Sequence, residues 1–384
     1  MAFNGGMGVL RVFKFRLYPS RRQLLELDGQ RFLAKQLWNE LLAASKQHYK
    51  DFGFFLSRNS MQLMCKNYGL YSQAQQSVVF NLELAVKRFC KLKKQGKRVG
   101  FPRFKSVDRV KSLHYPQFGF RLEGKKLRVN PFGLIPVKHH RTIEGGIKNL
   151  TLKREASGKW FACFVVELPE KPAPVHGGKK VGIDLGLEKF ATLSNGFVVA
   201  NPRHLRKREE KLVLEQRRLS RKKRGSRNRG RQRLKVARVY ERVSNSRKDF
   251  LHKTSHWLVN SFSLIALEDL RVASMVQNKQ LSKSISDVSW SSFTGMLYYK
   301  AVEAGSTVVF VDAKNTTRQC SDCGLMVAKA LSERVHECTC GLVLDRDLNA
   351  ARNILIRATP GIGGSQALRD ESSGVVGEER SPQL

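Results

Sequence analysis

The sequence has few acidic residues for its length and no long apolar run. It holds 32 Asp and Glu against 70 Lys and Arg, which gives a formal net charge of +38. Such an excess repels itself unless a polyanion neutralises it, so nucleic acid is the expected partner and a membrane surface the weaker alternative. Because no stretch of about 18 apolar residues occurs, we expect no membrane-spanning helix.

Two further absences concern the N-terminus and cysteine. The opening residues, MAFNGGMGVLRVFKF, lack the long apolar region and cleavage site of a secretory signal. The chain has 7 cysteines, and four of them lie between positions 320 and 340. This clustering favours a metal site in a reducing compartment over a set of disulfides. With 384 residues, 41% of them hydrophobic, the chain can build two or three domains.

The hydrophobic pattern of the first half predicts a strand, then helices, then more strands. Residues 10–20 alternate apolar and basic side chains, which is typical of a strand. Residues 21–95 carry Leu, Phe and Trp at helical spacing, and residues 112–168 return to a strand-like pattern. Between them lies a basic segment broken by Gly and Pro, residues 96–106. The Pro- and Gly-rich segment 169–180 is the best candidate for a domain boundary.

The pattern of the second half predicts an α/β domain. VGIDLGLEKFATLSNGFVVANP predicts two or three strands joined by tight turns, and LIALEDL and STVVFVDA predict further strands. Helices are expected in residues 203–248 apart from the break RGSRNRG, and in DFLHKTSHWLVNSF, VSWSSFTGMLYYKAVEAG and DLNAARNILIRA. Acids fall on the first strand, the fourth strand and the last helix. This order matches a ribonuclease H-like sheet.

Those three acids are Asp184, Glu268 and Asp347. A carboxylate in an apolar strand costs several kcal/mol to desolvate unless it is paired or bound to a metal. Each acid alone could cap a turn or pair with a lysine, and Asp347 could be a helix N-cap. Together, in a chain suited to polyanions, they match two-metal phosphodiester cleavage, in which carboxylates hold two Mg²⁺ ions.

The clustered cysteines form two pairs. Cys320 and Cys323 lie in CSDCG, where the glycine lets backbone N–H groups turn toward sulfur, and Cys338 and Cys340 lie in CTCG. Four thiolates predict one structural Zn²⁺ ion. The second pair is one residue shorter than the common pattern, so His336 could compete as a ligand. A degenerate ribbon held by packing is the alternative.

Residues 203–248 are a strongly basic stretch. They hold 20 Lys and Arg and only 4 Glu, so we expect this stretch to lie along a phosphate backbone. Three aromatic residues in and just after this stretch, Tyr240, Phe250 and Trp257, have helical spacing and are expected in the core. The stretch contains one run of four cations, namely Arg221, Lys222, Lys223 and Arg224.

A second basic feature is the loop PRFKS. It places Arg103 and Lys105 on either side of Phe104, and proline restricts its backbone. Both cations could contact phosphate.

Several motifs together resemble the TnpB proteins of bacterial and archaeal insertion sequences. GIDLGLEKFATLSNG, IALEDL, the CSDCG…CTCG ribbon and DRDLNAARNIL occur in the order and at the separations of that family. RLYPSRRQ, SQAQQ…NLELAVKRF, GFPRFKS and HKTSHWLV are also similar to its segments. The resemblance covers roughly residues 10–358. TnpB proteins are RNA-guided DNA endonucleases related to the type V CRISPR nucleases.

The resemblance implies an α+β multidomain fold. It combines a split β-barrel, the wedge, into which a helical recognition domain is inserted, with a RuvC-like nuclease domain that carries an inserted zinc ribbon. The implied limits are 1–20 and 112–170 for the wedge, 21–111 for the recognition domain, 178–314 and 343–358 for the nuclease, 315–342 for the ribbon and 359–384 for a disordered tail.

The resemblance also implies a mechanism and partners. A guide RNA transcribed from the transposon end binds the protein, which reads a short motif in duplex DNA and cuts the paired target with Mg²⁺. The expected partners are therefore guide RNA and double-stranded DNA, with no membrane and no small-molecule substrate. The expected location is the bacterial or archaeal cytoplasm, in association with the nucleoid.

Family positions carry over to single residues. Asp184 matches the first RuvC acid, Glu268 the second, and Asp347, two before Asn-Ala-Ala, the third. Asp345 would then be a supporting residue. Gln76, in SQAQQ, falls where the family contacts the motif-bearing duplex.

Three rival functions remain open. A catalytically inactive relative would bind DNA through its guide and repress, but all three acids are present here. A DNA transposase with a similar sheet usually orders its acids Asp, Asp, Glu, whereas this chain runs Asp, Glu, Asp. A basic RNA-binding protein without catalysis would leave the acids in the apolar strands unexplained.

Overall fold

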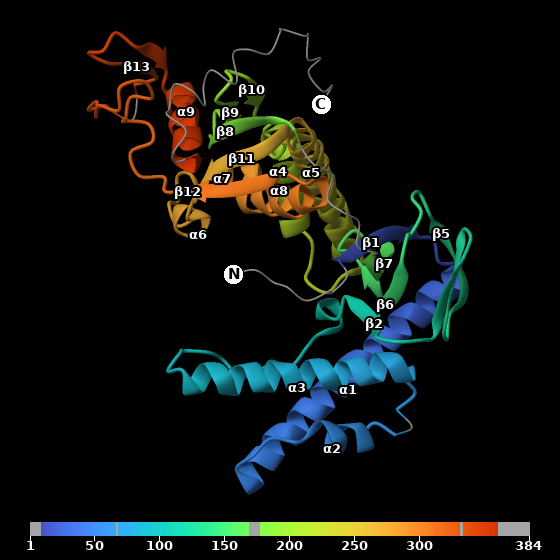
Figure 1. Ribbon diagram of the computed structural model, residues 1–384. Coiled ribbons are helices and arrows are strands. Elements are labelled where there is room, and N and C mark those ends of the chain that lie inside the picture. Colours follow the sequence, from blue (N-terminus) through green and yellow to red (C-terminus); the bar gives the residue numbers. More distant parts are fainter. Residues whose placement is uncertain (1–8, 67, 169–176, 331–332, 360–384) are drawn as a thin grey trace. The chain divides into compact units, whose positions relative to one another are not determined.

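The computed structural model describes residues 9–66, 68–168, 177–330 and 333–359. The chain divides into two compact units, Met1–Lys171 and Pro172–Leu384 (Figure 1). The division falls inside the Pro- and Gly-rich segment 169–180. The expected tail beyond Thr359 and residues 169–176 of the expected linker lie outside the described residues.

The first unit contains a seven-stranded sheet with every pairing antiparallel. Its order is β2-β6-β7-β1-β5-β4-β3, so the first strand of the chain lies between two strands that come more than a hundred residues later. The strands are β1 (Val9–Leu17), β2 (Ser112–Tyr115), β3 (Phe120–Glu123), β4 (Lys126–Val129), β5 (Gly133–Lys138), β6 (Gly146–Arg154) and β7 (Trp160–Leu168).

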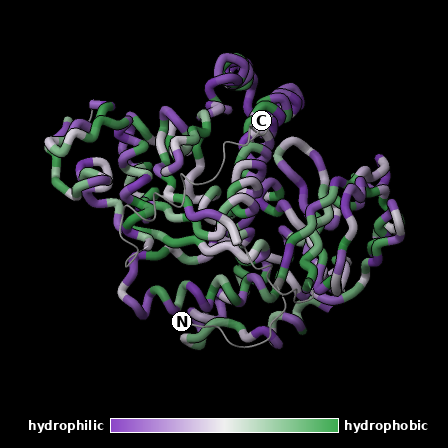
Figure 2. Tube along the Cα trace, turned by 45° about the horizontal axis from the view of Figure 1, so that its top comes forward, coloured by the Kyte–Doolittle hydropathy of each residue, from purple (hydrophilic) through white to green (hydrophobic). Residues whose placement is uncertain are grey.

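The helices of the first unit are inserted between β1 and β2. The first begins at a capping box, in which the Ser20 hydroxyl and the Gln23 side chain each accept a hydrogen bond from the other residue's backbone N–H, and it ends at Gly53 with φ of 78°. Figure 2 shows hydrophobic and hydrophilic residues alternating along the helices, as expected where one face is buried. The helices are α1 (Arg21–Phe52), α2 (Arg58–Leu63) and α3 (Ser72–Lys94).

The second unit is built on a five-stranded mixed sheet of order β10-β9-β8-β11-β12. β8, β11 and β12 are parallel, whereas β9 and β10 are antiparallel additions at one edge. A separate hairpin, β13 with β14, follows the fifth strand. The strands are β8 (Lys179–Leu185), β9 (Lys189–Leu193), β10 (Val198–Ala200), β11 (Phe262–Glu268), β12 (Thr307–Val311), β13 (Val335–Glu337) and β14 (Val343–Asp345).

Helices cover both faces of this sheet, with α5 and α8 on one face and α9 on the other (Figure 1). Val181 and Ile183 of β8 are buried with Phe250 of α5 and Phe293 of α8, which form the main core of the unit. The helices are α4 (Glu209–Ser220), α5 (Arg227–Ser261), α6 (Val272–Met275), α7 (Ser282–Val288), α8 (Trp290–Ala304) and α9 (Arg346–Ala358).

Most of the expected elements are confirmed, including the mixed α/β character of the second half. Two expected helices are in fact one, because α5 runs without a break for 35 residues through DFLHKTSHWLVNSF. The expectation for Tyr240 was wrong. Its side chain is 47% exposed and its hydroxyl accepts a hydrogen bond from Gln216, whereas Phe250 is buried. No helix in the described ranges is long and apolar enough to cross a membrane.

Candidate active site and metal centre

Asp184 and Glu268 lie at the same level near the carboxyl ends of two neighbouring parallel strands. β8 and β11 pair in a register that joins Ile183 to Leu267. The next residue of each strand is therefore an acid. The carboxyl ends of parallel strands in an open α/β sheet are where such folds place their ligands.

Both acids face α9. Side chains alternate along a strand, and Ile183 points into the core formed with α5 and α8, so Asp184 points to the opposite face. On β11, Ala266 is buried in a cluster with Ile354 of α9. Glu268 follows Ala266 by two residues and shares that face.

Gly182 lets α9 approach β8 at backbone distance. A Cβ atom on Gly182 would lie 2.1 Å from the carbonyl oxygen of Ala351 and 2.7 Å from the backbone nitrogen of Leu355. No other residue type fits there without moving the helix. Ala350 and Ala351 are fully buried, and their small side chains permit the same close packing. Asp347 lies one helical turn before Ala351 and is thereby brought toward Asp184.

The negative charges of the other two acids act on Asp184. Burial, and then the negative charges of Glu268 and Asp347, raise the pKa of Asp184 to about 8, while Arg346 opposes the rise. Burial also raises the pKa of Glu268, against the lowering effect of a hydrogen bond from Thr316. The site is a half-buried group of like charges, which favours a bound cation.

Asp345 caps α9, and Asp347 does not. The Asp345 carboxylate accepts hydrogen bonds from the backbone N–H groups of Asp347 at 2.9 Å and Leu348 at 3.2 Å. It also pairs with Lys189 at 2.8 Å. Asp347 therefore lies in the first turn of the helix with its side chain free of capping, and the alternative that Asp347 is the N-cap was wrong.

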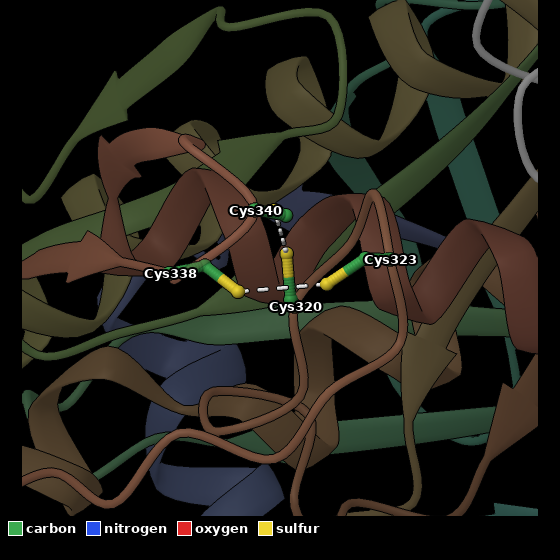
Figure 3. A group of neighbouring side chains, drawn as sticks. All are labelled: Cys320, Cys323, Cys338 and Cys340. Atoms are coloured by element: carbon green, nitrogen blue, oxygen red, sulfur yellow. Dashed lines mark hydrogen bonds between the residues drawn. The ribbon is translucent and has the colours of Figure 1, made fainter.

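The four clustered cysteines converge on one point (Figure 3). Their sulfur atoms all lie within 4.8 Å of one another. The sulfurs of Cys320 and Cys340 are 3.7 Å apart, and those of Cys323 and Cys338 are 3.5 Å apart. The group could hold a metal ion. Among the residues that the structure describes, no other group of three or more His, Cys, Asp or Glu brings its ligand atoms this close.

The short CTCG pair forms a turn comparable to that of the longer pair. Each pair is followed by a glycine in the left-handed region, Gly324 with φ of 79° and Gly341 with φ of 94°. The backbone N–H of Cys340 points at the sulfur of Cys338 and lowers the pKa of that thiol to about 7. The missing residue therefore does not prevent the sulfurs from converging.

His336 is not part of the cysteine group. It is fully buried on β13, and within the described part of the chain neither of its ring nitrogens has a hydrogen-bond partner. Burial lowers the pKa of His336, which keeps the ring neutral.

The expected nucleic-acid contacts lie at exposed or half-buried positions. Gln76 is exposed on α3, Arg103 is exposed, and Lys105 is half-buried. The four cations Arg221–Arg224 are exposed in the turn between α4 and α5. Arg229 holds this turn through the carbonyl oxygens of Leu219 and Lys222.

The sequence reasoning missed four residues around the acids. Thr316 donates a hydrogen bond to Glu268, and Asn349, Asn353 and Arg357 of α9 hold the loop that carries Thr316. The last three are four residues apart, so their spacing on one helix face could have indicated a shared partner. A lone threonine in NTTRQC gives no such signal.

Three family models match parts of the chain. "Helix-turn-helix domain" matches residues 7–53, which the structure describes as strand β1 and helix α1. "Probable transposase" matches residues 163–279, and "Cas12f1-like, TNB domain" matches residues 290–354, which include all four clustered cysteines.

A relative from Streptomyces pristinaespiralis, named "Putative RNA-guided DNA endonuclease", is 32% identical over 363 residues, or 90% of this chain and 89% of that protein. The chain belongs to the TnpB family. Another relative of the family is the Escherichia coli "Putative RNA-guided DNA endonuclease InsQ", which is 29% identical and is covered to 92% of its length.

The fold also resembles that of a solved structure, titled "Structure of the mini-RNA-guided endonuclease CRISPR-Cas_phi3". The TM-score is 0.52 at 9% identity, and the match covers 91% of this TnpB-family chain and 93% of the other. At this identity the likeness concerns the fold alone.

Proposed function

We propose that this chain is an RNA-guided DNA endonuclease of an insertion sequence, which cuts target DNA beside a short duplex motif. The observation that carries the proposal is the placement of Asp184 and Glu268 at the ends of adjacent parallel strands, facing the helix that bears Asp347. Two relatives aligned over 90% of the chain carry the name of such an enzyme. The net charge of +38 suits two polyanionic partners.

The catalytic group is proposed to be Asp184, Glu268 and Asp347, with two Mg²⁺ ions as cofactors. The donor set fits, because carboxylate oxygens suit Mg²⁺ and the negative charges of Glu268 and Asp347, which act on Asp184, are ones that a dication would neutralise. Each of the two ions needs only one or two carboxylate ligands. The three carboxylates therefore need not lie as close to one another as the four cysteine sulfurs do. When bound, the ions would activate water and stabilise the leaving oxygen.

The chain's own groups orient these acids. Asp345 takes the capping role and leaves the Asp347 carboxylate available. Arg346 lies with its Nε 3.5 Å from Asp347 Oδ1 and supplies a positive charge beside the acids.

The cysteine group is proposed to hold one structural Zn²⁺ ion. In a tetrahedral site with Zn–S bonds of ~2.3 Å, the sulfurs lie ~3.8 Å apart. The distances of 3.5 and 3.7 Å are close to that value. With four thiolates, the site has no open position for substrate.

The loop at Lys105 is proposed to bind backbone phosphate in a pocket between α1 and α3. Asn39 of α1 fixes both the backbone N–H and the carbonyl of Lys105. The ammonium lies 3.0 Å from the centre of the Trp38 ring, and Arg109 and Lys111 line the same pocket. In the part of the chain that the structure describes, no carboxylate pairs with Lys105. A half-buried cation without an anion is suited to phosphate.

The remaining nucleic-acid contacts and the domain boundaries are also proposals. Gln76 and the exposed Arg103 are assigned to nucleic acid, as are Arg221, Lys222, Lys223 and Arg224. The wedge, recognition, nuclease and ribbon limits stated from the resemblance are retained. The proposed location is the bacterial or archaeal cytoplasm, at the nucleoid.

The direct experiment purifies the protein after expression with its native flanking locus. We expect a discrete RNA to co-purify, and a plasmid matching that RNA to be cut in the presence of Mg²⁺ while an unmatched plasmid stays intact. Absence of bound RNA contradicts guidance by RNA. Equal cutting of both plasmids contradicts recognition by base pairing.

One observation favours a second candidate, a DNA transposase, because residues 163–279 match the model described as "Probable transposase". Strand transfer joins a DNA end to a new site, whereas hydrolysis leaves free ends. Joined products in the same reaction would therefore favour this candidate. An inactive repressor would bind the matched plasmid and leave it uncut.

A further inference from the structure

One face of α9 holds the loop between β12 and the cysteine ribbon. Asn349, Asn353 and Arg357 are spaced four residues apart and so lie in one row along the helix. All three side chains bond to atoms of residues 312–321. The same helix carries Asp347 in its first turn.

The two asparagines are buried in this contact, and both hydrogen-bond to the loop. Asn349 is 0% exposed, accepts from the Ser321 N–H at 2.9 Å and donates to the Gln319 carbonyl at 2.7 Å. Asn353 is 3% exposed and donates to the carbonyl oxygens of Thr316 at 2.9 Å and Gln319 at 2.6 Å. Buried amides are costly unless paired, so these bonds fix the path of the loop.

Arg357 extends the row by one turn. Its Nη1 donates to the carbonyl oxygens of Asp312 and Lys314, each at 2.8 Å, and its Nη2 donates to the Gln319 side chain at 2.9 Å. Burial raises the pKa of Glu268, and the positive charge of Arg357 opposes that rise.

The loop fixed in this way delivers Thr316 to Glu268. The Thr316 side chain is 2% exposed, and its hydroxyl donates to Glu268 Oε1. The other acceptor within reach, the carbonyl of Ala313, lies at 3.3 Å and offers the weaker bond. Cys320 follows on the same loop, so the hydrogen bonds from α9 to this loop support both the cysteine ribbon and Thr316.

We propose that Thr316 is a positioning residue for Glu268, and that α9 places Glu268 and Asp347 together by fixing Thr316 and carrying Asp347. The inference rests on the proposed function, because it assigns Glu268 a role in holding the catalytic cations. The Thr316 hydroxyl engages Oε1 of the Glu268 carboxylate and leaves Oε2 to bind a cation. Loss of such an outer partner commonly costs ~10–100-fold in metal affinity or activity.

The test compares Thr316→Ser, Thr316→Val and Thr316→Ala in the ribonucleoprotein. Serine keeps the hydroxyl, valine keeps the shape, and alanine cannot overpack the site. For each variant we would measure Mn²⁺ binding by electron paramagnetic resonance, the rate of cutting at saturating matched plasmid, KM for the plasmid, the thermal midpoint and the zinc content.

We expect T316V and T316A to bind Mn²⁺ ~10-fold more weakly and to cut at least ~10-fold more slowly, with KM, melting and zinc unchanged. T316S should stay within about threefold of wild type. Wild-type Mn²⁺ affinity in T316V and T316A would overturn the inference, as would losses that parallel a lowered thermal midpoint in both. Failure of the wild type to cut any plasmid would instead count against the proposed function, and the Mn²⁺ comparison would still test the positioning.

Discussion

The absence of a side chain at Gly182 decides how closely α9 can lie against β8. An added Cβ would meet backbone atoms of α9, which cannot move as a flexible side chain could. We expect Gly182→Ala to destabilise the second unit by about 3 kcal/mol, at the upper end of overpacking effects, and to lower cutting. Denaturant unfolding followed by circular dichroism would measure this loss in the free energy of unfolding.

Gly230→Ala is the matched control, because Gly230 lies in α5 and a Cβ there meets nothing within 4 Å. This change should stabilise the chain by up to about 1 kcal/mol through helix propensity. Equal stability of the Gly182→Ala and Gly230→Ala proteins would contradict the close-packing account.

The lowered pKa of Lys105 predicts that nucleic-acid binding depends on pH. Burial lowers the pKa of Lys105 to about 8, so the side chain is charged below that pH and loses its charge as pH rises through it. His114, which lines the same pocket, has a lowered pKa and stays neutral over this range. Affinity for the guide RNA should therefore fall between pH 7 and pH 9 more steeply in wild type than in Lys105→Arg.

Fluorescence anisotropy with labelled guide RNA at fixed ionic strength measures this difference. Arginine stays charged throughout, so it isolates the contribution of residue 105. Parallel pH profiles for the two proteins would rule out a phosphate contact by Lys105.

From the sequence, residues could be selected where their chemistry is conspicuous in its surroundings. Asp184 and Glu268 were selected because acids are rare in apolar strands; the structure places them on neighbouring strands, and their catalytic role stays a prediction. The sequence could not show that Asp345 is the N-cap of α9. Asp345 and Asp347 are two residues apart and offer equivalent capping groups, so only the backbone path of the structure distinguishes them. Thr316 was missed because its partner lies 48 positions away in the chain, on another element.

At the scale of elements, the start of α9 separates the capping role of Asp345 from the catalytic role proposed for Asp347. Asparagine caps a helix as well as aspartate does, but it cannot act as an anionic ligand. We expect Asp345→Asn to cut at nearly the wild-type rate, and Asp345→Ala to lose about 1 kcal/mol of stability. The exposed pair with Lys189 should add little to either result.

Thermal melting and the cutting rate together check this assignment. Should Asp345→Asn abolish cutting while melting normally, Asp345 would be a ligand rather than a cap.

The cysteine ribbon should depend on its metal. Because metal binding organises a ribbon that has little core of its own, removing zinc with a chelator or by Cys323→Ser should lower the thermal midpoint. Cutting should fall as well, since Cys320 lies on the loop that holds Thr316. Cys90→Ser, outside the group, is the control. An unchanged melting profile in chelator, with zinc shown to be absent, would contradict the structural role.

The presence and type of the helices and strands were predicted better than the residues at which they begin and end. Periodicity gave the strands and helices of both halves, because burial of one face imposes a period of two or 3.6. The expected helix boundary before Asp249 was wrong, because no cap or proline marks it and α5 continues through it to reach 35 residues. Hydrophobic periodicity also could not predict the order of the strands in the sheet. For example, β1 pairs with β7 and β5, which lie far along the chain.

At the scale of the whole molecule, charge and membership of the TnpB family point to the same role. A net charge of +38 over 384 residues is hard to hold in one folded chain without a polyanion, and two relatives in the family carry the name "Putative RNA-guided DNA endonuclease". The charge concerns binding, and neither feature identifies the residues that break the bond. The three acids carry that part of the account, and they occupy a small part of the second unit.

The most direct test of the central claim is the rate of matched-plasmid cutting by single and double acid variants. The account predicts that Asp184→Ala, Glu268→Ala and Asp347→Ala each reduce the rate to background, and that the Asp184→Ala/Glu268→Ala double variant is no slower than either single one, because the acids act as a unit. Guide RNA and target DNA should remain bound in all of them. Cutting that persists in any one of the single variants would contradict the claim that these three carboxylates form the active site.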